Sequence, residues 1–231
     1  MPNYIKGAEM KYIDIHTHRF DLSEDSMSVV NLFPEEKPSG EAGNVFYSVG
    51  LHPWHVREGA LGAALEKIEK LLAFEKVIAI GEIGLDKACG VPFELQERAF
   101  RTQLDIAGTL EMPVIIHCVR AYPEILRIRK EIKKATPWII HGFQGNIQTA
   151  RQLMEKGIRL SFGAVLKKTE HKASSVFKEI PDDAFFLESD ESGSDIRDIY
   201  ALAAEMRENN INELKSQLAQ NFVACFGDKI L

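Results

Sequence analysis

The sequence Tyr12-Ile13-Asp14-Ile15-His16-Thr17-His18 is an apolar run that ends in two histidines one residue apart. Alternation along a β-strand would place Asp14, His16 and His18 on the same face. Two imidazoles on one face of a strand end can bind one divalent cation, because both rings converge on a point just beyond the backbone. A pair of surface histidines would give the same motif, so the rest of the chain has to decide between these interpretations.

The composition indicates one globular domain that spans residues 1–231, because 45% of the 231 residues are hydrophobic and 27% are charged. The formal charge of −6 and the pI of about 5.7 argue against a broad basic surface that follows many phosphates. A phosphate-bearing substrate is still compatible with this charge, since bound metal ions supply positive charge locally.

The chain has the features of a cytoplasmic protein, and we expect a monomer. No stretch approaches the roughly 18 consecutive apolar residues of a membrane span, so we expect no membrane contact. Residues 1–10 contain no apolar core of a secretory signal. The three cysteines, Cys89, Cys118 and Cys225, lack metal-finger spacing, which indicates free thiols in a reducing compartment. In a strand Cys118 would point away from His117, so we expect it to pack in the core.

Eight short apolar runs are candidate strands, and they cover residues 12–18, 28–33, 45–51, 77–80, 113–116, 138–140, 158–162 and 184–187. Amphipathic helices are predicted after most of them, for example over residues 61–72 and 122–134, and from Pro92 onward. Two further helices close the chain, the second of them starting at Asn210. Apolar strands that alternate with helices predict a parallel sheet covered by helices. Eight strands favour a single (β/α)8 TIM-barrel-like domain, irregular in its first two units, where no good helix is found.

Polar side chains follow these strands at their carboxyl ends, and they are His16, His18, His52, Glu82, His117, His141 and Asp190. In a parallel barrel the carboxyl ends meet on one face, where active sites of this architecture are built. Six of the seven histidines lie at or just past a predicted strand end, and only His171 does not. This distribution favours one shared site over scattered surface or core histidines.

The set of four imidazoles and two carboxylates exceeds what one tetrahedral zinc ion needs. A carboxylate can bridge two cations, and Glu82 on the central strand is the natural bridge. We therefore expect a site for two divalent metal ions. Ligation rich in imidazole suits zinc or manganese better than magnesium, although carboxylate and water ligands keep magnesium among the candidates.

The chain resembles the TatD family of metal-dependent hydrolases (TatD-like deoxyribonucleases). The motifs that carry the resemblance run in order through the chain, as His16-Thr17-His18, Gly50-Leu51-His52-Pro53, Gly81-Glu82-Ile83-Gly84-Leu85-Asp86, Pro113 to His117, His141 to Gly145, and Leu187-Glu188-Ser189-Asp190. The resemblance implies one metal bound by His16, His18, Glu82 and Asp190. It implies a second metal bound by Glu82, His117 and His141.

The resemblance also implies hydrolysis of phosphodiesters, as in an exonuclease-type deoxyribonuclease that acts on DNA ends. Besides Glu82, the catalytic residues would then be Asp190, which takes a proton from the attacking water, and His52. His52 and Arg120 would hold a phosphate oxygen, and Trp54 would stack on a base. The structural alternatives are that His52 shapes a turn, Arg120 caps a helix and Trp54 belongs to the core.

Two nearby acidic residues receive other expectations. Asp14 lies deeper on the histidine face, where it would orient a ligand ring. Glu188 would point away from the barrel interior if its strand continued, so we give it no role.

The chain departs from the family pattern in places that concern the substrate pocket and leave the metal ligands intact. Arg120 lies three residues after His117, where the family often has an arginine two residues on. An acidic and polar segment, residues 191–195, follows Asp190 where a proline is common.

Three alternatives to a nuclease stay open. An amidohydrolase-like enzyme would share the histidines but often carries a bridging lysine where this chain has Glu82. A phosphatase for a small phosphate-bearing substrate fits the acidic pI. A purely structural metal site is disfavoured, because such sites are usually closed four-ligand cages, often rich in cysteine.

Overall fold

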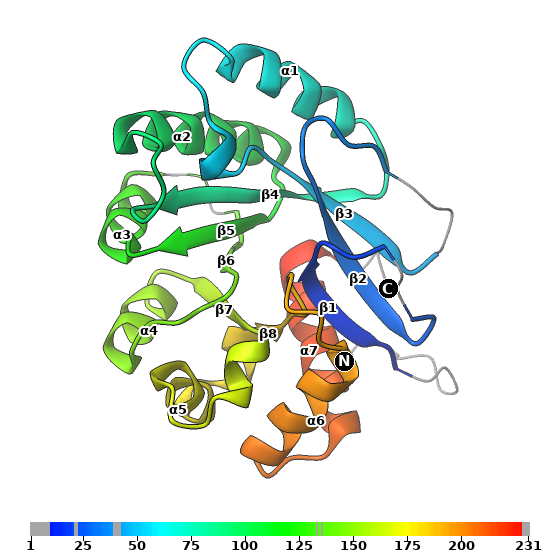
Figure 1. Cartoon of the computed structure of the whole chain (residues 1–231). Helices are drawn as coiled ribbons and strands as arrows, with labels where there is room; N and C mark the ends of the chain where they lie inside the picture. The colour runs from blue at the N-terminus through cyan, green and yellow to red at the C-terminus, as the bar shows by residue number, and fades with distance from the viewer. Residues whose placement is uncertain (1–9, 21–22, 39–42, 133, 135, 228–231) are drawn as a thin grey trace.

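The computed structural model describes residues 10–20, 23–38, 43–132, 134 and 136–227, so nine of the ten residues searched for a secretory signal lie outside the described residues. Eight strands form one parallel sheet in chain order. They are β1 (Tyr12–Thr17), β2 (Ser26–Leu32), β3 (Val45–Val49), β4 (Val77–Asp86), β5 (Val114–Val119), β6 (Trp138–Ile140), β7 (Ile158–Phe162) and β8 (Phe185–Leu187). Figure 1 shows them arranged around a common axis. The predicted (β/α)8 barrel is confirmed.

The barrel closes where β1 meets the segment after β8. Asp190 N–H donates to the His16 carbonyl at 3.0 Å, next to a bridge between Thr17 and Asp190. The phenol of Tyr200 adds a link from outside, because it accepts from Ile13 N–H at 2.9 Å and donates to Ile13 C=O at 3.1 Å. These contacts bring the carboxyl ends of the first and last strands together, although no regular ladder joins them.

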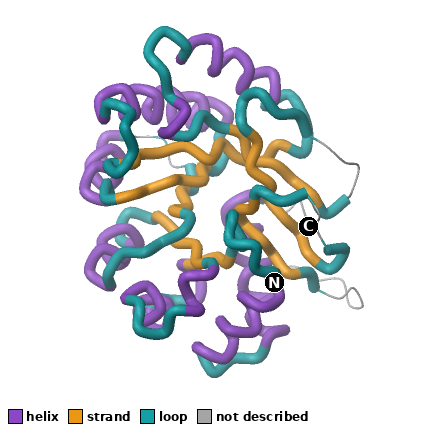
Figure 2. The backbone as a smooth tube through the Cα atoms, in the orientation of Figure 1, coloured by secondary structure: helices purple, strands orange, loops and turns teal. Residues whose placement is uncertain are grey.

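Helices lie outside the strands, as Figure 2 shows in purple. They are α1 (Leu61–Leu71), α2 (Phe93–Leu110), α3 (Tyr122–Glu131), α4 (Ile147–Met154), α5 (Lys172–Glu179), α6 (Ile196–Met206) and α7 (Ile211–Phe226). Three 3-10 turns complete the set: η1 (Pro53–His55), η2 (Ala164–Lys167) and η3 (Asp182–Ala184). The described parts of the β1–β2 and β2–β3 connections contain no helix, so the predicted reduction of the first two units is confirmed. None of the described helices is long and apolar enough to span a bilayer.

Local sequence explains most helix starts. Helix α2 begins directly after Pro92, as predicted. Helix α7 begins at Ile211 and is capped by the predicted Asn210, whose side chain accepts from Asn212 N–H at 2.8 Å. Helix α5 was not predicted. Its apolar residues Ala173, Val176 and Phe177, followed by Ile180, have helical spacing and are buried. The short length of this helix, eight residues, explains why its pattern is weak.

Strand β4 is the longest of the sheet and determines the geometry of the site. It was predicted to end at Ile80, but all ten residues from Val77 to Asp86 are extended and buried. Alternation places Glu82, Gly84 and Asp86 on one face of this strand. Two carboxylates therefore leave β4 on the same side, with a glycine between them.

A candidate metal centre

The carboxylate of Glu82 is the centre of the candidate site. It is buried on β4, and five imidazoles from other strand ends have a ring nitrogen within 3.5 Å of it. The nitrogen-to-oxygen distances are 3.4 Å for His16, 3.5 Å for His18, 3.2 Å for His52, 2.7 Å for His117 and 2.7 Å for His141. We call these five residues the histidine cluster. The structure therefore brings every predicted histidine of the site to one carboxylate.

The two oxygens of Glu82 face two different groups. Oε2 faces Nε2 of His16 and of His18, which also lie 3.7 and 3.8 Å from Asp190 Oδ1. Oε1 faces the second group, whose members are His52, His117 and His141. The first group is the pair that the resemblance assigns to one metal, and the second contains the pair assigned to the other metal together with His52, which was expected to bind substrate. Ligand atoms of His16, His141 and Asp190 also lie within 4.8 Å of one another, so the division of ligands between two metals stays a prediction.

His16 shows how well these residues fit a bound cation. Its side chain is fully buried, and neither ring nitrogen has a hydrogen-bond partner among the described residues. Its Nε2 is nevertheless aimed between the carboxylates of Glu82 and Asp190. Buried polar atoms in proteins are nearly always partnered. An unpartnered imidazole nitrogen facing two carboxylates therefore fits a ligand of a divalent metal such as zinc or manganese.

The cluster keeps Glu82 ionised. Burial alone would raise its pKa, but the charge of His141 and hydrogen bonds from the surrounding imidazoles outweigh burial and hold the pKa of Glu82 well below its usual value. Burial likewise disfavours the charged form of His141, yet Glu82 and Glu188 raise the pKa of His141 well above its usual value. The pKa of His52 is lowered, because burial dominates there in spite of Glu82.

Two further carboxylates stand behind ligand histidines. Asp86 Oδ2 lies 3.2 Å from His117 Nε2 and leaves Nδ1 of that ring facing Glu82. Glu188 Oε1 lies 3.7 Å from His141 Nδ1, while Nε2 of His141 faces Glu82. Glu188 also accepts from Gly142 N–H at 2.6 Å. A carboxylate at the distance of Asp86 orients a ligand histidine in metal sites. Glu188 lies beyond hydrogen-bond distance of His141 Nδ1 and acts on that ring through its charge.

Asp86 and Glu188 received no role from the sequence. Asp86 follows Glu82 by four residues on a continuous strand, so alternation was a signal that could have identified it. The strand β8 ends at Leu187, so the alternation that pointed Glu188 outward does not apply. Glu188 is buried against His141 instead.

Asp14 has a different partner from the one expected. Its carboxylate accepts from the backbone N–H of Ser189 at 2.9 Å and from the Ser189 hydroxyl at 2.6 Å, and it orients no ligand ring. Burial raises the pKa of Asp14 to about 7. Asp14 therefore holds Ser189, the residue before Asp190, in place. Asp190 has a positive φ of 50°.

The predicted substrate residues differ in their surroundings. His52 is buried, and its Nδ1 accepts from Trp54 N–H at 3.3 Å, so it shapes the η1 turn while its Nε2 faces Glu82. Arg120 is exposed just after β5 and makes no ion pair or hydrogen bond with the described residues, so it caps no helix. Trp54 is 56% exposed and does not belong to the core. Cys118 is buried in the core, as predicted, and burial raises its pKa to about 12.

Comparisons with known proteins identify relatives of this chain. The sequence model of the family described as "TatD related DNase" matches residues 20–227. The metal-dependent hydrolase YabD of Bacillus subtilis, named as uncharacterized, is 36% identical over 149 residues, which are 63% of this chain and 58% of YabD. The "3'-5' ssDNA/RNA exonuclease TatD" of Musicola paradisiaca is 34% identical over 156 residues, which are 65% of this chain and 58% of that protein. The chain thus aligns with less than two thirds of the length of these relatives.

The fold has a close counterpart among solved structures. The crystal structure of YjjV, a TatD homologue from Escherichia coli, superposes with a TM-score of 0.82 at 22% identity, and the match covers 96% of this chain and 100% of YjjV. At this identity the likeness concerns the fold.

Proposed function

The chain belongs to the TatD related DNase family, and on that premise we propose that it is a hydrolase, dependent on two divalent metal ions, that cleaves phosphodiester bonds at nucleic-acid ends. The observation that carries the proposal is the position of Glu82, whose two oxygens face two separate sets of ligand atoms. The name of the Musicola relative supports the choice of a nucleic-acid substrate.

The metal ligands in this proposal are those that surround Glu82. One cation would be held by His16, His18, Glu82 and Asp190, and the other by Glu82, His117 and His141. When bound, such cations lower the pKa of water and neutralise the charge that develops on phosphoryl oxygens.

Three side chains would transfer the proton and contact the phosphate in this proposal. Asp190 is the most exposed carboxylate of the ligand set, with 36% of its side chain accessible, so it can accept the proton of the attacking water. The Nδ1 atom of His52 accepts a hydrogen bond, so its proton lies on Nε2 and points into the site, where it can donate to a phosphate oxygen. Arg120 makes no ion pair with the described residues, so its guanidinium is available for a phosphate oxygen.

Hydrolysis assays with defined substrates test this proposal. The protein is stripped of metal and reloaded with manganese, zinc or magnesium. It is then incubated with end-labelled single-stranded DNA, an aryl phosphodiester, an aryl phosphomonoester and a dihydropyrimidine-type amide. We expect metal-dependent shortening of the DNA from one end. Turnover of the phosphomonoester or the amide alone would contradict the nuclease and favour a small-molecule hydrolase.

A second readout separates a catalytic from a structural metal site. Circular dichroism of the stripped protein should retain the helical signal, because the core forms from apolar strands and helices without the histidines. Loss of the fold on metal removal would indicate a structural site.

A further inference from the structure

Trp54 is an exposed aromatic residue at the mouth of the candidate site. It lies in η1, two residues after His52, and 56% of its surface is accessible. The other tryptophan, Trp138, is fully buried in the core. Large aromatic side chains in a folded protein are mostly buried, because each removes a large apolar area from water. Exposure alone does not set Trp54 apart, because Phe20 and Phe74 are also about half exposed, at 48% and 50%. What distinguishes Trp54 is its place next to the histidine cluster.

Trp54 is held in place although it is exposed. Its indole N–H donates to Asp86 Oδ2 at 2.6 Å, which satisfies the only polar group of the ring. The ring also packs at right angles to His52, with centroids 4.9 Å apart. The accessible part of the side chain is consequently a fixed carbon surface, which binds flat apolar groups at little cost in side-chain entropy.

The anchor of Trp54 connects it to the reacting centre. Asp86 Oδ2 contacts both the Trp54 indole and Nε2 of His117. The Trp54 and His117 ring centroids are 5.9 Å apart. The Trp54 ring is thus joined through Asp86 to His117, whose Nδ1 faces Glu82.

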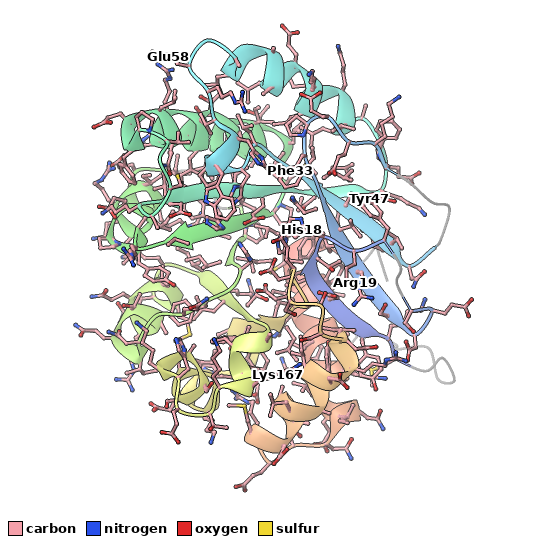
Figure 3. All side chains as sticks on the ribbon, viewed as in Figure 1. His18, Arg19, Phe33, Tyr47, Glu58 and Lys167 are labelled. Carbon is pink, nitrogen blue, oxygen red and sulfur yellow. The ribbon has the colours of Figure 1, made fainter. Side chains whose placement is uncertain are left out.

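Aromatic rings continue from Trp54 along one side of the mouth. His52 contacts His55, with centroids 5.8 Å apart, and His55 contacts Phe33 at 5.0 Å. Phe33 in turn lies 5.8 Å from His18, and Figure 3 shows these two residues close together at the open end of β1 and β2. Phe33 is half-buried, whereas His55 is exposed like Trp54. The rings therefore border the histidine cluster from β1 to η1.

We propose that Trp54 is the stacking platform for the base of the nucleotide beside the scissile phosphate, with Phe33 and His55 bordering the same path. This inference rests on the proposed function and adds the subsite that recognises the end of the strand. Stacking on aromatic side chains tolerates every base, because every base has a π face. The subsite accordingly accepts single-stranded ends of any sequence and rejects ends that lack a base.

Tryptophan fluorescence tests the stacking directly. The chain has only two tryptophans, and Trp138 is shielded, so quenching by a short single-stranded oligodeoxynucleotide reports on Trp54. The oligonucleotide carries phosphorothioate linkages to prevent cleavage, and a second version lacks the terminal base. We expect saturable quenching by the first oligonucleotide, little by the abasic one, and none for Trp54→Phe. Equal quenching by both oligonucleotides, or none by either, would overturn the inference.

Steady-state kinetics provide the second test. Trp54→Ala should raise KM for normal DNA ends by about 5- to 150-fold, the range expected for one lost base stack. For abasic DNA ends, the KM of the variant should equal that of the wild type. Phe74→Ala is the matched control, because Phe74 is 50% exposed but precedes β4, at the opposite end of the barrel from Asp86. If DNA is cleaved but Trp54→Ala has a wild-type KM, the stacking inference is wrong and the proposed function stands. If no phosphodiester is cleaved, the proposed function is wrong, and the fluorescence titration alone decides the stacking.

Discussion

His117 Nε2 lies 3.2 Å from Asp86 Oδ2, on the side of the ring opposite to Nδ1, which lies 2.7 Å from Glu82 Oε1. Asp86 thus contacts the ring nitrogen of a candidate metal ligand that faces away from Glu82, although it lies outside the ligand set. Loss of such a carboxylate usually lowers metal affinity by about 10- to 100-fold. We expect Asp86→Ala to weaken metal binding by this factor, as measured by calorimetric titration of the stripped protein. Asp105→Ala on the exposed face of α2 should bind metal as the wild type does.

Glu188 should have a comparable effect through His141. Glu188→Gln keeps an acceptor for Gly142 N–H but removes the negative charge beside His141 Nδ1. We expect weaker metal binding with an unchanged circular dichroism spectrum. The control is Glu170→Gln, which changes an exposed carboxylate outside the site. Metal affinity equal to that of the wild type would mean that the backbone alone positions His141.

Gly84 allows β4 and β5 to approach each other beneath the site. A Cβ atom there would lie 2.0 Å from the His117 carbonyl oxygen, and the φ of 152° disfavours any other residue. Gly84→Ala should therefore lower the free energy of unfolding by at least about 2 kcal/mol in urea titrations. It should also displace His117 and reduce metal affinity. Gly62→Ala, in an open position of α1, should instead be neutral or stabilising by up to about 1 kcal/mol.

The thiols should differ sharply in reactivity. Burial raises the pKa of Cys118 to about 12 and that of Cys225 to about 11, so both stay protonated and shielded at pH 8. Cys89 is only partly buried. Alkylation of the native protein followed by mass spectrometry should thus modify Cys89 first. Rapid modification of Cys118, or loss of turnover in Cys118→Ala, would indicate a catalytic thiol.

The sequence was sufficient to predict the parts of the site that depend on local pattern. Apolar runs that lead to His16, Glu82 or His141 predict a strand and also predict that the polar residue lies in the shared site. The reason is that the carboxyl ends of parallel strands meet on one face. The partner of Asp14 could not be predicted in this way. Asp14 binds Ser189, which is 175 residues away, and only closure of the barrel brings the two together.

The local sequence pattern also did not show whether the side chains of Glu188 and Trp54 are buried or exposed. Glu188 looked like an outward-facing residue because the end of β8 at Leu187 could not be read from the sequence. For Trp54 the sequence left two interpretations open, a base-stacking residue and a core residue. Trp54 is exposed, and its indole N–H is bound to Asp86 of β4, a contact across 32 residues that local pattern does not reveal.

If Glu82 holds two divalent cations, its removal should change the metal content of the protein, and metal analysis of Glu82→Ala measures this change. Wild type and variant are loaded with manganese or zinc, freed of excess metal and measured by inductively coupled plasma mass spectrometry, with DNA hydrolysis and circular dichroism followed in parallel. We expect about two equivalents of metal and metal-dependent cleavage for the wild type. We expect depleted metal, no turnover and a native spectrum for the variant. A folded Glu82→Ala protein with unchanged metal content and an unchanged rate would show that Glu82 holds no catalytic metal.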